Sequence, residues 1–143
     1  AAALTPGRRP RTTLSPTLAF DVDGGRMALG TPGGDQQDQW QLPFLLRVLV
    51  GGYEPQEAID APTLHTTALI DSFWPREWDP AGVVVEDRIG DDVIDELVAR
   101  GHDVLRAGPW RLGRLSAIGV RPDGVRLWGA ANPRGMQGYA IGR

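Results

Sequence analysis

Apolar and polar side chains alternate in two separate stretches of the chain, and a short turn interrupts each stretch. In residues 17–29 every second position is apolar on both sides of Asp23-Gly24-Gly25, whose glycines tolerate the positive φ of a tight turn. Residues 115–130 repeat this arrangement around Arg121-Pro122-Asp123-Gly124. The pattern therefore predicts two β-hairpins.

A three- and four-residue spacing of apolar side chains predicts a first main helix that begins near Asp35. Gly51-Gly52 ends it, because glycine is favoured just beyond a helix C-terminus. Pro43 removes one backbone donor, so we expect either a kink near Gln39 or two helices that abut at Pro43. The buried stripe of this helix is predicted to contain Trp40, Phe44, Leu45, Val48 and Leu49.

One further main helix is predicted to begin at Asp91, which acts as its N-cap, and to close at Gly101. A short helix over residues 56–60 and a short strand over 83–85 precede it. Residues 63–82 hold three large aromatic side chains among prolines, which suggests an ordered loop fixed by those aromatics. The buried stripe of the second main helix is predicted to be Val93, Ile94, Leu97 and Val98.

Length and composition favour one domain. With 143 residues and 41% apolar side chains, we predict a single α+β unit over residues 1–143, in which residues 1–10 form an extended arm. No apolar run reaches the roughly 20 residues of a membrane helix. A net charge of −3 with scattered arginines argues against nucleic acid as a partner. Without cysteine there is no disulfide or thiolate nucleophile, and the cellular compartment stays undetermined.

The segment Gly30-Thr31-Pro32-Gly33-Gly34 lies between the first hairpin and the first main helix. No side chain covers the backbone N–H groups of Gly33 and Gly34, and the positive end of the helix points to the same place. Two such amides can cradle an anion, although a glycine pair on its own is more often a simple turn.

This glycine segment is one of several motifs that together resemble the small subunit of the γ-glutamyltranspeptidases. The resemblance implies an α+β fold, one part of the αββα sandwich of the N-terminal-nucleophile hydrolases, with two hairpins and two main helices. It covers nearly the whole chain, and its motifs are Gly7-Arg8-Arg9-Pro10-Arg11-Thr12-Thr13-Leu14-Ser15-Pro16, Gly30-Thr31-Pro32-Gly33-Gly34, Gln56-Glu57-Ala58-Ile59-Asp60-Ala61-Pro62, Arg100-Gly101-His102 and Asn132-Pro133-Arg134-Gly135 with Gly138.

The resemblance also implies a chemistry, the transfer of a γ-glutamyl group from glutathione or a related amide to water or an amine. It assigns the oxyanion hole to the N–H groups of Gly33 and Gly34, and part of the α-carboxylate pocket to the hydroxyls of Thr12 and Thr13. The family's nucleophile is the first residue of the small subunit, a threonine activated by its own α-amine. Ala1 has no hydroxyl, so we expect the nucleophile to lie outside this chain.

On its own the chain is therefore expected to be inactive. We interpret it as the C-terminal part of a small subunit, with the remainder of that subunit and the large subunit as partners and a homo-oligomer as a further possibility. The two hairpins leave strand edges unpaired, so we expect order only beside the missing segment or in a dimer. No cofactor, metal, nucleic acid or membrane partner is expected.

Some departures from the family's pattern leave the acyl group open. Threonines replace a pair of serines at positions 12 and 13, Thr63 replaces an arginine, residues 73–78 look like an insertion, and residues 36–39 are unusually polar. One alternative is an amide acylase of the cephalosporin or glutaryl type with the same fold. Another is a non-catalytic assembly domain.

Other candidate residues have simpler interpretations. His65 and His102 lack the spacing of metal ligands. Arg134 is interpreted as a structural ion-pair partner. The acids Glu86, Asp87, Asp91, Asp92, Asp95 and Glu96 lack the ligand pattern of a calcium-binding loop. Acids in the first turn of the second main helix are interpreted as complementing its dipole.

Overall fold

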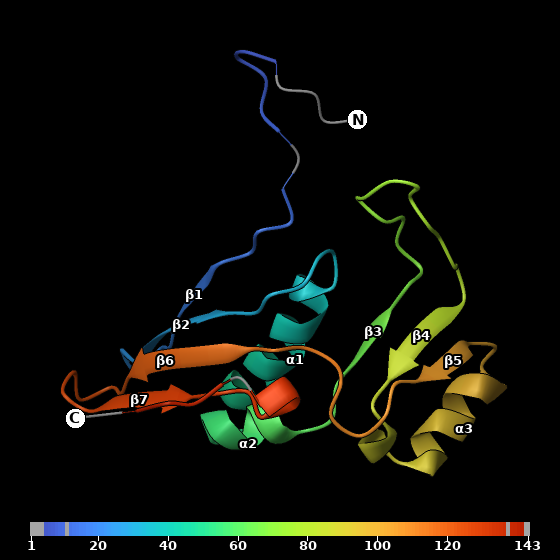
Figure 1. Cartoon of the computed structure of the whole chain (residues 1–143). Helices are drawn as coiled ribbons and strands as arrows, with labels where there is room; N and C mark the ends of the chain where they lie inside the picture. The colour runs from blue at the N-terminus through green and yellow to red at the C-terminus, as the bar shows by residue number, and fades with distance from the viewer. Residues whose placement is uncertain (1–4, 11, 137, 142–143) are drawn as a thin grey trace.

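The computed structural model describes residues 5–10, 12–136 and 138–141, which contain two β-sheets and three α-helices (Figure 1). The first sheet has the order β1-β2-β6-β7, and all its neighbours are antiparallel. Both predicted hairpins are present, and the pairing of β2 with β6 joins them into one sheet. Its strands are β1 (Thr17–Phe20), β2 (Arg26–Gly30), β6 (Ser116–Val120) and β7 (Leu127–Ala130).

One face of the first sheet is covered by α1 (Gln37–Leu49) and α2 (Pro55–Asp60). Phe44 of α1 and Ile59 of α2 are 2% and 4% exposed. The core between helices and sheet contains Met27, Leu29, Phe44, Ala58, Ile59, Leu115, Ala117 and Ala130. This core holds the end of β2, and with it the glycine segment, in place.

The opposite face of the first sheet is apolar and exposed. Side chains of directly paired residues share a face, and the pairs Leu18 with Ala28 and Ala28 with Ile118 form one row across three strands. The exposed large side chains on this open face are Leu18, Phe20, Ile118 and Leu127.

The second sheet has the order β3-β4-β5. Strand β3 (Leu64–Thr66) is antiparallel to β4 (Gly82–Val85), whereas β5 (Asp103–Arg106) is parallel to β4. Helix α3 (Asp91–Ala99) forms the crossover between β4 and β5, after a 3₁₀ turn at Asp87–Ile89. The core between this sheet and α3 comprises Val83, Val85 and Ile94, and Ile89, Leu97 and Val104 pack against it.

Several sequence expectations need correction here. Strands β3 and β5 were not predicted. Val93 and Val98 of α3 are 39% and 54% exposed, so its buried stripe is narrower than expected and centres on Ile94. The N-cap of α3 is Gly90, with no side-chain cap, and the carboxylate of Asp91 pairs with Arg106 instead.

Helix α1 runs without interruption through Pro43, so the alternative of two abutting helices is wrong. The loop that follows β3 is held mainly by hydrogen bonds rather than by buried aromatics. Trp74 is 90% exposed and Trp78 is 60% exposed, but the Trp78 Nε1–H donates to the carbonyl of Ala68. The backbone bonds from Asp71 to Glu77 and from Asp79 to Thr67 close the loop.

Residues 5–10 form neither helix nor strand and are exposed, and the N-terminal segment leads away from both sheets (Figure 1). A second 3₁₀ turn spans Arg134–Met136 near the other end. Within the described residues no helix has the length and apolar character needed to cross a membrane.

Candidate functional site

The glycine pair lies in the turn between the end of β2 at Gly30 and the start of α1 at Gln37. Gln37 holds both glycine carbonyls, because its backbone N–H donates to Gly34 O at 3.3 Å and its Nε2 donates to Gly33 O at 2.5 Å. Among the described residues, neither glycine N–H donates a hydrogen bond. The two amides therefore lie outside the β-ladder, with no acceptor among the described residues.

The two glycines differ in how strictly their positions require glycine. Gly33 has a φ of 144°, and a Cβ there would stand 2.6 Å from Cζ3 of Trp40. Gly34 is approached from the other side, since its Cβ would stand 3.1 Å from Cε2 of Phe73 in the loop after β3. Both the conformation and the close Trp40 ring exclude a side chain at position 33.

Ser15 connects the N-terminal segment to this turn. Its hydroxyl donates to Oε1 of Gln37 at 2.9 Å, and Nε2 of Gln41 donates to both the carbonyl and the hydroxyl of Ser15. Since Gln37 also holds Gly33, two successive hydrogen bonds join Ser15 to the glycine turn. Ser15, Gln37 and Gln41 were not predicted as site residues; the only signals in the sequence were the Ser-Pro step and the polar run after the glycines.

Thr12 and Thr13 precede Ser15 by three and two residues, respectively. The Thr12 hydroxyl accepts a hydrogen bond from the N–H of Leu14 at 3.1 Å. In the part of the chain that the structure describes, no hydrogen bond joins either threonine to Gly33 or Gly34. Among the hydrogen bonds of the described residues, Ser15 makes the connection between the two predicted site segments.

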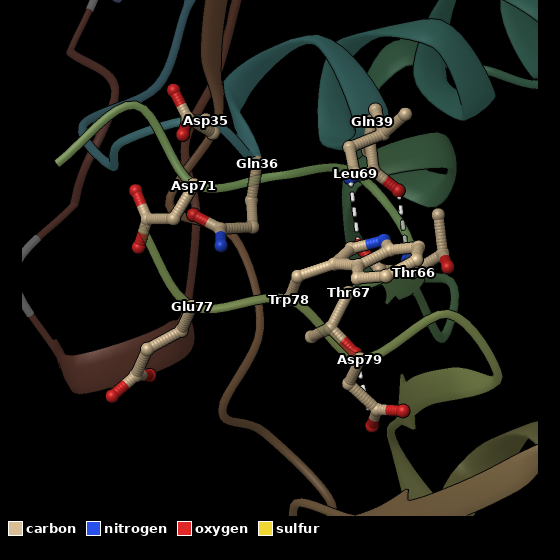
Figure 2. A pocket seen from close by; sticks show the side chains of 10 residues that line it. All are labelled: Asp35, Gln36, Gln39, Thr66, Thr67, Leu69, Asp71, Glu77, Trp78 and Asp79. Atoms are coloured by element: carbon tan, nitrogen blue, oxygen red, sulfur yellow. Dashed lines mark hydrogen bonds between the residues drawn. The ribbon is translucent and has the colours of Figure 1, made fainter. Parts of the chain in front are cut away.

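A hollow of about 280 Å³ lies beside the first turn of α1 (Figure 2). The Asp35 carboxylate accepts a hydrogen bond from the N–H of Ser72, which ties the loop after β3 to the glycine turn. Gln39 bonds both the N–H and the carbonyl of Thr66 and so anchors α1 to β3. Four carboxylates give the hollow a negative lining: its residues are Asp35, Gln36, Gln39, Thr66, Thr67, Leu69, Asp71, Glu77, Trp78 and Asp79.

The most buried carboxylate of the site region belongs to Glu86, directly after β4, with none of the side chain exposed. Arg134 binds it with two parallel bonds, Nε to Oε1 at 2.7 Å and Nη2 to Oε2 at 2.8 Å. The N–H groups of Arg111 and Leu112 donate to Oε1 at 2.9 and 3.1 Å. Burial raises the pKa of Glu86, but these bonds outweigh burial, and the net pKa lies below its usual value.

Two arginines extend this cluster to the end of α2. Arg134 Nη1 donates to Ile59 O at 2.7 Å, and Arg88 Nη1 donates to Asp60 O at 2.9 Å. The Arg88 guanidinium also lies 3.3 Å from the ring centre of Trp110. The expectation that Arg134 forms a structural ion pair is confirmed. The burial of Glu86 was not predicted, and its carboxylate belongs to this buried cluster.

The histidines do not form a metal site. His65 is 8% exposed, burial lowers its pKa, and its ring meets Trp40 edge-on at 5.6 Å. In the described residues no group of three or more metal-ligating side chains is suitably placed to hold an ion.

Comparison with known proteins identifies the family of this chain. A family model described as gamma-glutamyltranspeptidase matches residues 1–142. The chain is 34% identical to the glutathione hydrolase-like YwrD proenzyme of Bacillus subtilis over 97% of its length, and 35% identical to the oxamate amidohydrolase proenzyme of Klebsiella pneumoniae over 98%. It spans 25% of each of these relatives.

Solved structures agree with the family match. A structure of LmbA2991 is 52% identical and superposes with a TM-score of 0.89, covering 99% of this chain and 25% of that one. Gamma-glutamyltranspeptidase from Pseudomonas nitroreducens is 26% identical with a TM-score of 0.71, covering 99% of this chain and 66% of that one. The expected fold class, α+β and part of an N-terminal-nucleophile hydrolase, is confirmed. With a family match along nearly its whole length and the fold of that family's solved members, the chain belongs to the γ-glutamyltranspeptidase family.

Proposed function

We propose that this chain is the C-terminal part of a γ-glutamyltransferase or glutathione hydrolase, and that Gly33 and Gly34 supply its oxyanion hole. The observation that supports this most directly is the pair of N–H groups, where β2 passes into α1, that have no acceptor among the described residues. Thr12 and Thr13 contribute hydroxyls to the pocket for the α-carboxylate, positioned through Ser15 and Gln37.

In this proposal the nucleophile is a threonine from the remainder of the enzyme. Its hydroxyl attacks the amide carbonyl while its α-amine takes the proton. The carbonyl oxygen becomes an oxyanion that accepts hydrogen bonds from the amides of Gly33 and Gly34. The leaving amine departs with a proton, and water or a second amine then releases the acyl group. Each amide donor of this kind contributes about 10²- to 10³-fold to kcat.

The partners in this proposal are the large subunit and the rest of the small subunit. The exposed apolar face of the first sheet supports a partner of this kind, because such a face is stable in water only when another layer covers it. Leu18, Phe20, Ile118 and Leu127 are the side chains that the partner layer would bury.

A second candidate is an amide acylase of the same fold. Similarity to proteins named as acylases supports it, whereas the four carboxylates of the hollow beside Gly34 favour the α-ammonium group of a γ-glutamyl substrate over the net negative glutaryl group. Relatives named Acylase ACY 1 proenzyme are 34% and 33% identical to the chain. Comparing turnover of γ-glutamyl-p-nitroanilide with that of glutaryl-p-nitroanilide separates the two candidates, since the substrates differ only in the α-ammonium group.

The test of the oxyanion hole removes one N–H and leaves the shape of the turn unchanged. In the complete enzyme, replacement of Gly34 by glycolic acid through nonsense suppression converts that amide into an ester. We expect kcat per active site to fall about 10²- to 10³-fold while KM changes little.

The matched control is the same ester at Gly52, which is exposed and whose N–H also lacks a partner among the described residues. Turnover there should stay at the parent level. Equal turnover of the two ester variants would contradict the proposed oxyanion hole. The absence of a threonine nucleophile upstream in the complete enzyme would favour the non-catalytic assembly domain instead.

A further inference from the structure

Thr31, the first residue after β2, fixes the start of the glycine turn. Its hydroxyl accepts a hydrogen bond from the N–H of Arg114 at 3.0 Å and donates to the carbonyl of Pro32 at 2.8 Å. Thr31 is 9% exposed, so water competes poorly for these bonds. The position of the turn therefore depends on where the segment 111–114 lies.

The ring of Trp40 provides a second contact between the turn and this segment. It lies between two glycines, since a Cβ at Gly33 would stand 2.6 Å from Cζ3 and a Cβ at Gly113 would stand 3.2 Å from Cγ. Asn132 Nδ2 donates to the carbonyl of Gly113 at 3.3 Å and holds it from the other side. A shift of residues 111–114 would therefore move the Trp40 ring, and with it the position of Gly33, which packs against that ring.

The segment itself is fixed by the buried carboxylate of Glu86. Oε1 accepts from the N–H groups of Arg111 and Leu112, and Arg134 holds both carboxylate oxygens. Only Gly113 separates Leu112 from Arg114, whose N–H binds Thr31. The contacts between the ion pair and the glycine turn are thus continuous.

We propose that the buried Glu86–Arg134 pair positions the glycine turn through residues 111–114 and the hydroxyl of Thr31. Glu86, Arg134 and Thr31 are then positioning residues for the oxyanion hole, and none of them touches the substrate. This inference rests on the proposed role of Gly33 and Gly34. It adds that the C-terminal Arg134 acts on the reaction from a distance.

The test uses substitutions in the complete enzyme that preserve shape. Thr31→Val removes the hydroxyl without changing size, Thr31→Ser retains it, and Glu86→Gln removes the charge of the carboxylate. Active sites are titrated with a mechanism-based inhibitor, so that kcat refers only to correctly folded enzyme.

Because an ångström-scale misplacement can lower a rate about 10²-fold, we expect about a 100-fold lower kcat for Glu86→Gln and roughly a tenfold lower kcat for Thr31→Val. KM stays within about twofold, since only an interaction of the transition state is weakened. Thr31→Ser restores kcat to within about threefold of the parent, because its hydroxyl can still accept from Arg114. The control Glu54→Gln breaks the exposed ion pair with Arg121 and leaves kcat unchanged.

Hydrogen–deuterium exchange of the peptide that contains Gly33 and Gly34 gives a readout without turnover. Exchange should become faster in Thr31→Val and Glu86→Gln, but not in Thr31→Ser or Glu54→Gln. The inference is overturned if Thr31→Val and Thr31→Ser have equal kcat, or if Glu86→Gln lowers only the number of active sites. If the parent enzyme turns over neither anilide, the proposed function fails, and the exchange pattern alone then supports or overturns the positioning role.

Discussion

The buried cluster around Glu86 and the glycine turn differ in how many of their polar groups have hydrogen-bond partners. At Glu86 both carboxylate oxygens are bonded, and every nitrogen of the Arg134 guanidinium donates a hydrogen bond. In the turn the carbonyls of Gly33 and Gly34 are held by Gln37, whereas their N–H groups have no partner among the described residues. The carboxylate of Glu86 and the guanidinium of Arg134 therefore find their hydrogen-bond partners within the chain, whereas the two N–H groups of the turn leave room for a ligand as acceptor.

This difference separates the parts that maintain the fold from the parts available for chemistry. A buried charge without partners is strongly unfavourable, so the chain surrounds Glu86 with donors from five residues: Thr63, Arg88, Arg111, Leu112 and Arg134. Free N–H groups at the start of a helix cost little because water can accept their hydrogen bonds, and a bound anion can later replace that water. The comparison predicts that changes in the cluster affect stability first, and that changes in the turn affect activity first.

The largest expected effect on stability is that of Arg134→Met. It leaves the Glu86 carboxylate buried without its main partner and should lower the free energy of unfolding by about 3–5 kcal/mol. Urea denaturation of the complete enzyme at pH 7 measures this. Since the pKa of Glu86 lies below its usual value of 4.5, the stability from the pair is present above that pH and is lost as pH falls through the folded pKa.

Two controls accompany that variant. Arg121→Met breaks the exposed ion pair with Glu54 and should lower stability by at most about 1 kcal/mol. Adding Glu86→Gln to Arg134→Met removes the unpaired charge and should recover part of the loss. Equal effects of Arg134→Met and Arg121→Met would contradict the distinction between buried and exposed pairs.

An intermediate effect is expected in the glycine turn, where the two glycines should respond differently. Gly33→Ala places a side chain at a φ of 144° and against Trp40, and should lower stability by about 1–3 kcal/mol. Gly34→Ala meets only Phe73, which is 57% exposed and can move, so a loss of about 0.5 kcal/mol is expected. Thermal unfolding of the two variants compares them, and the reverse order would be inconsistent with this geometry.

The smallest expected effect concerns Asp123, an exposed carboxylate with partners like those of Glu86. The backbone N–H of Arg126, its side chain and the N–H of Val125 lower the pKa of Asp123 to about 2. Its contribution to stability is therefore present above pH 3.8 and is lost as pH falls toward 2. Arg126→Gln should raise this pKa only in part, because the backbone donors remain. NMR titration of the Asp123 carboxyl measures this pKa. A full return of the pKa to 3.8 would show that the side chain of Arg126 alone causes the shift.

The elements that could be predicted from the sequence are those that depend on residues close together in the chain. Both hairpins and α3 followed from side-chain period and turn glycines, which are local signals. The pairing of β2 with β6 joins residues about 90 positions apart, and no local pattern encodes it. Strand β3 was missed because Leu64-His65-Thr66 is too short to show alternation.

The same distinction applies to the candidate site. The glycine pair was found from its motif, but the role of Ser15 depends on a contact with Gln37 across 22 residues. The burial of Glu86 was missed because this residue stands first among the acids that continue into α3. Its position directly after the apolar strand β4 was the available signal that the carboxylate is buried.

The open face of the first sheet has a consequence for how such a molecule is made. An apolar sheet surface left in water adheres to other apolar surfaces, including copies of itself. Several relatives of this chain are named proenzymes, and a single precursor keeps the complementary layer tethered at a high effective concentration while the chain folds. In the enzyme proposed above, cleavage after folding would separate two pieces that have already covered each other, and this order of synthesis, docking and cleavage would protect the sheet from aggregation.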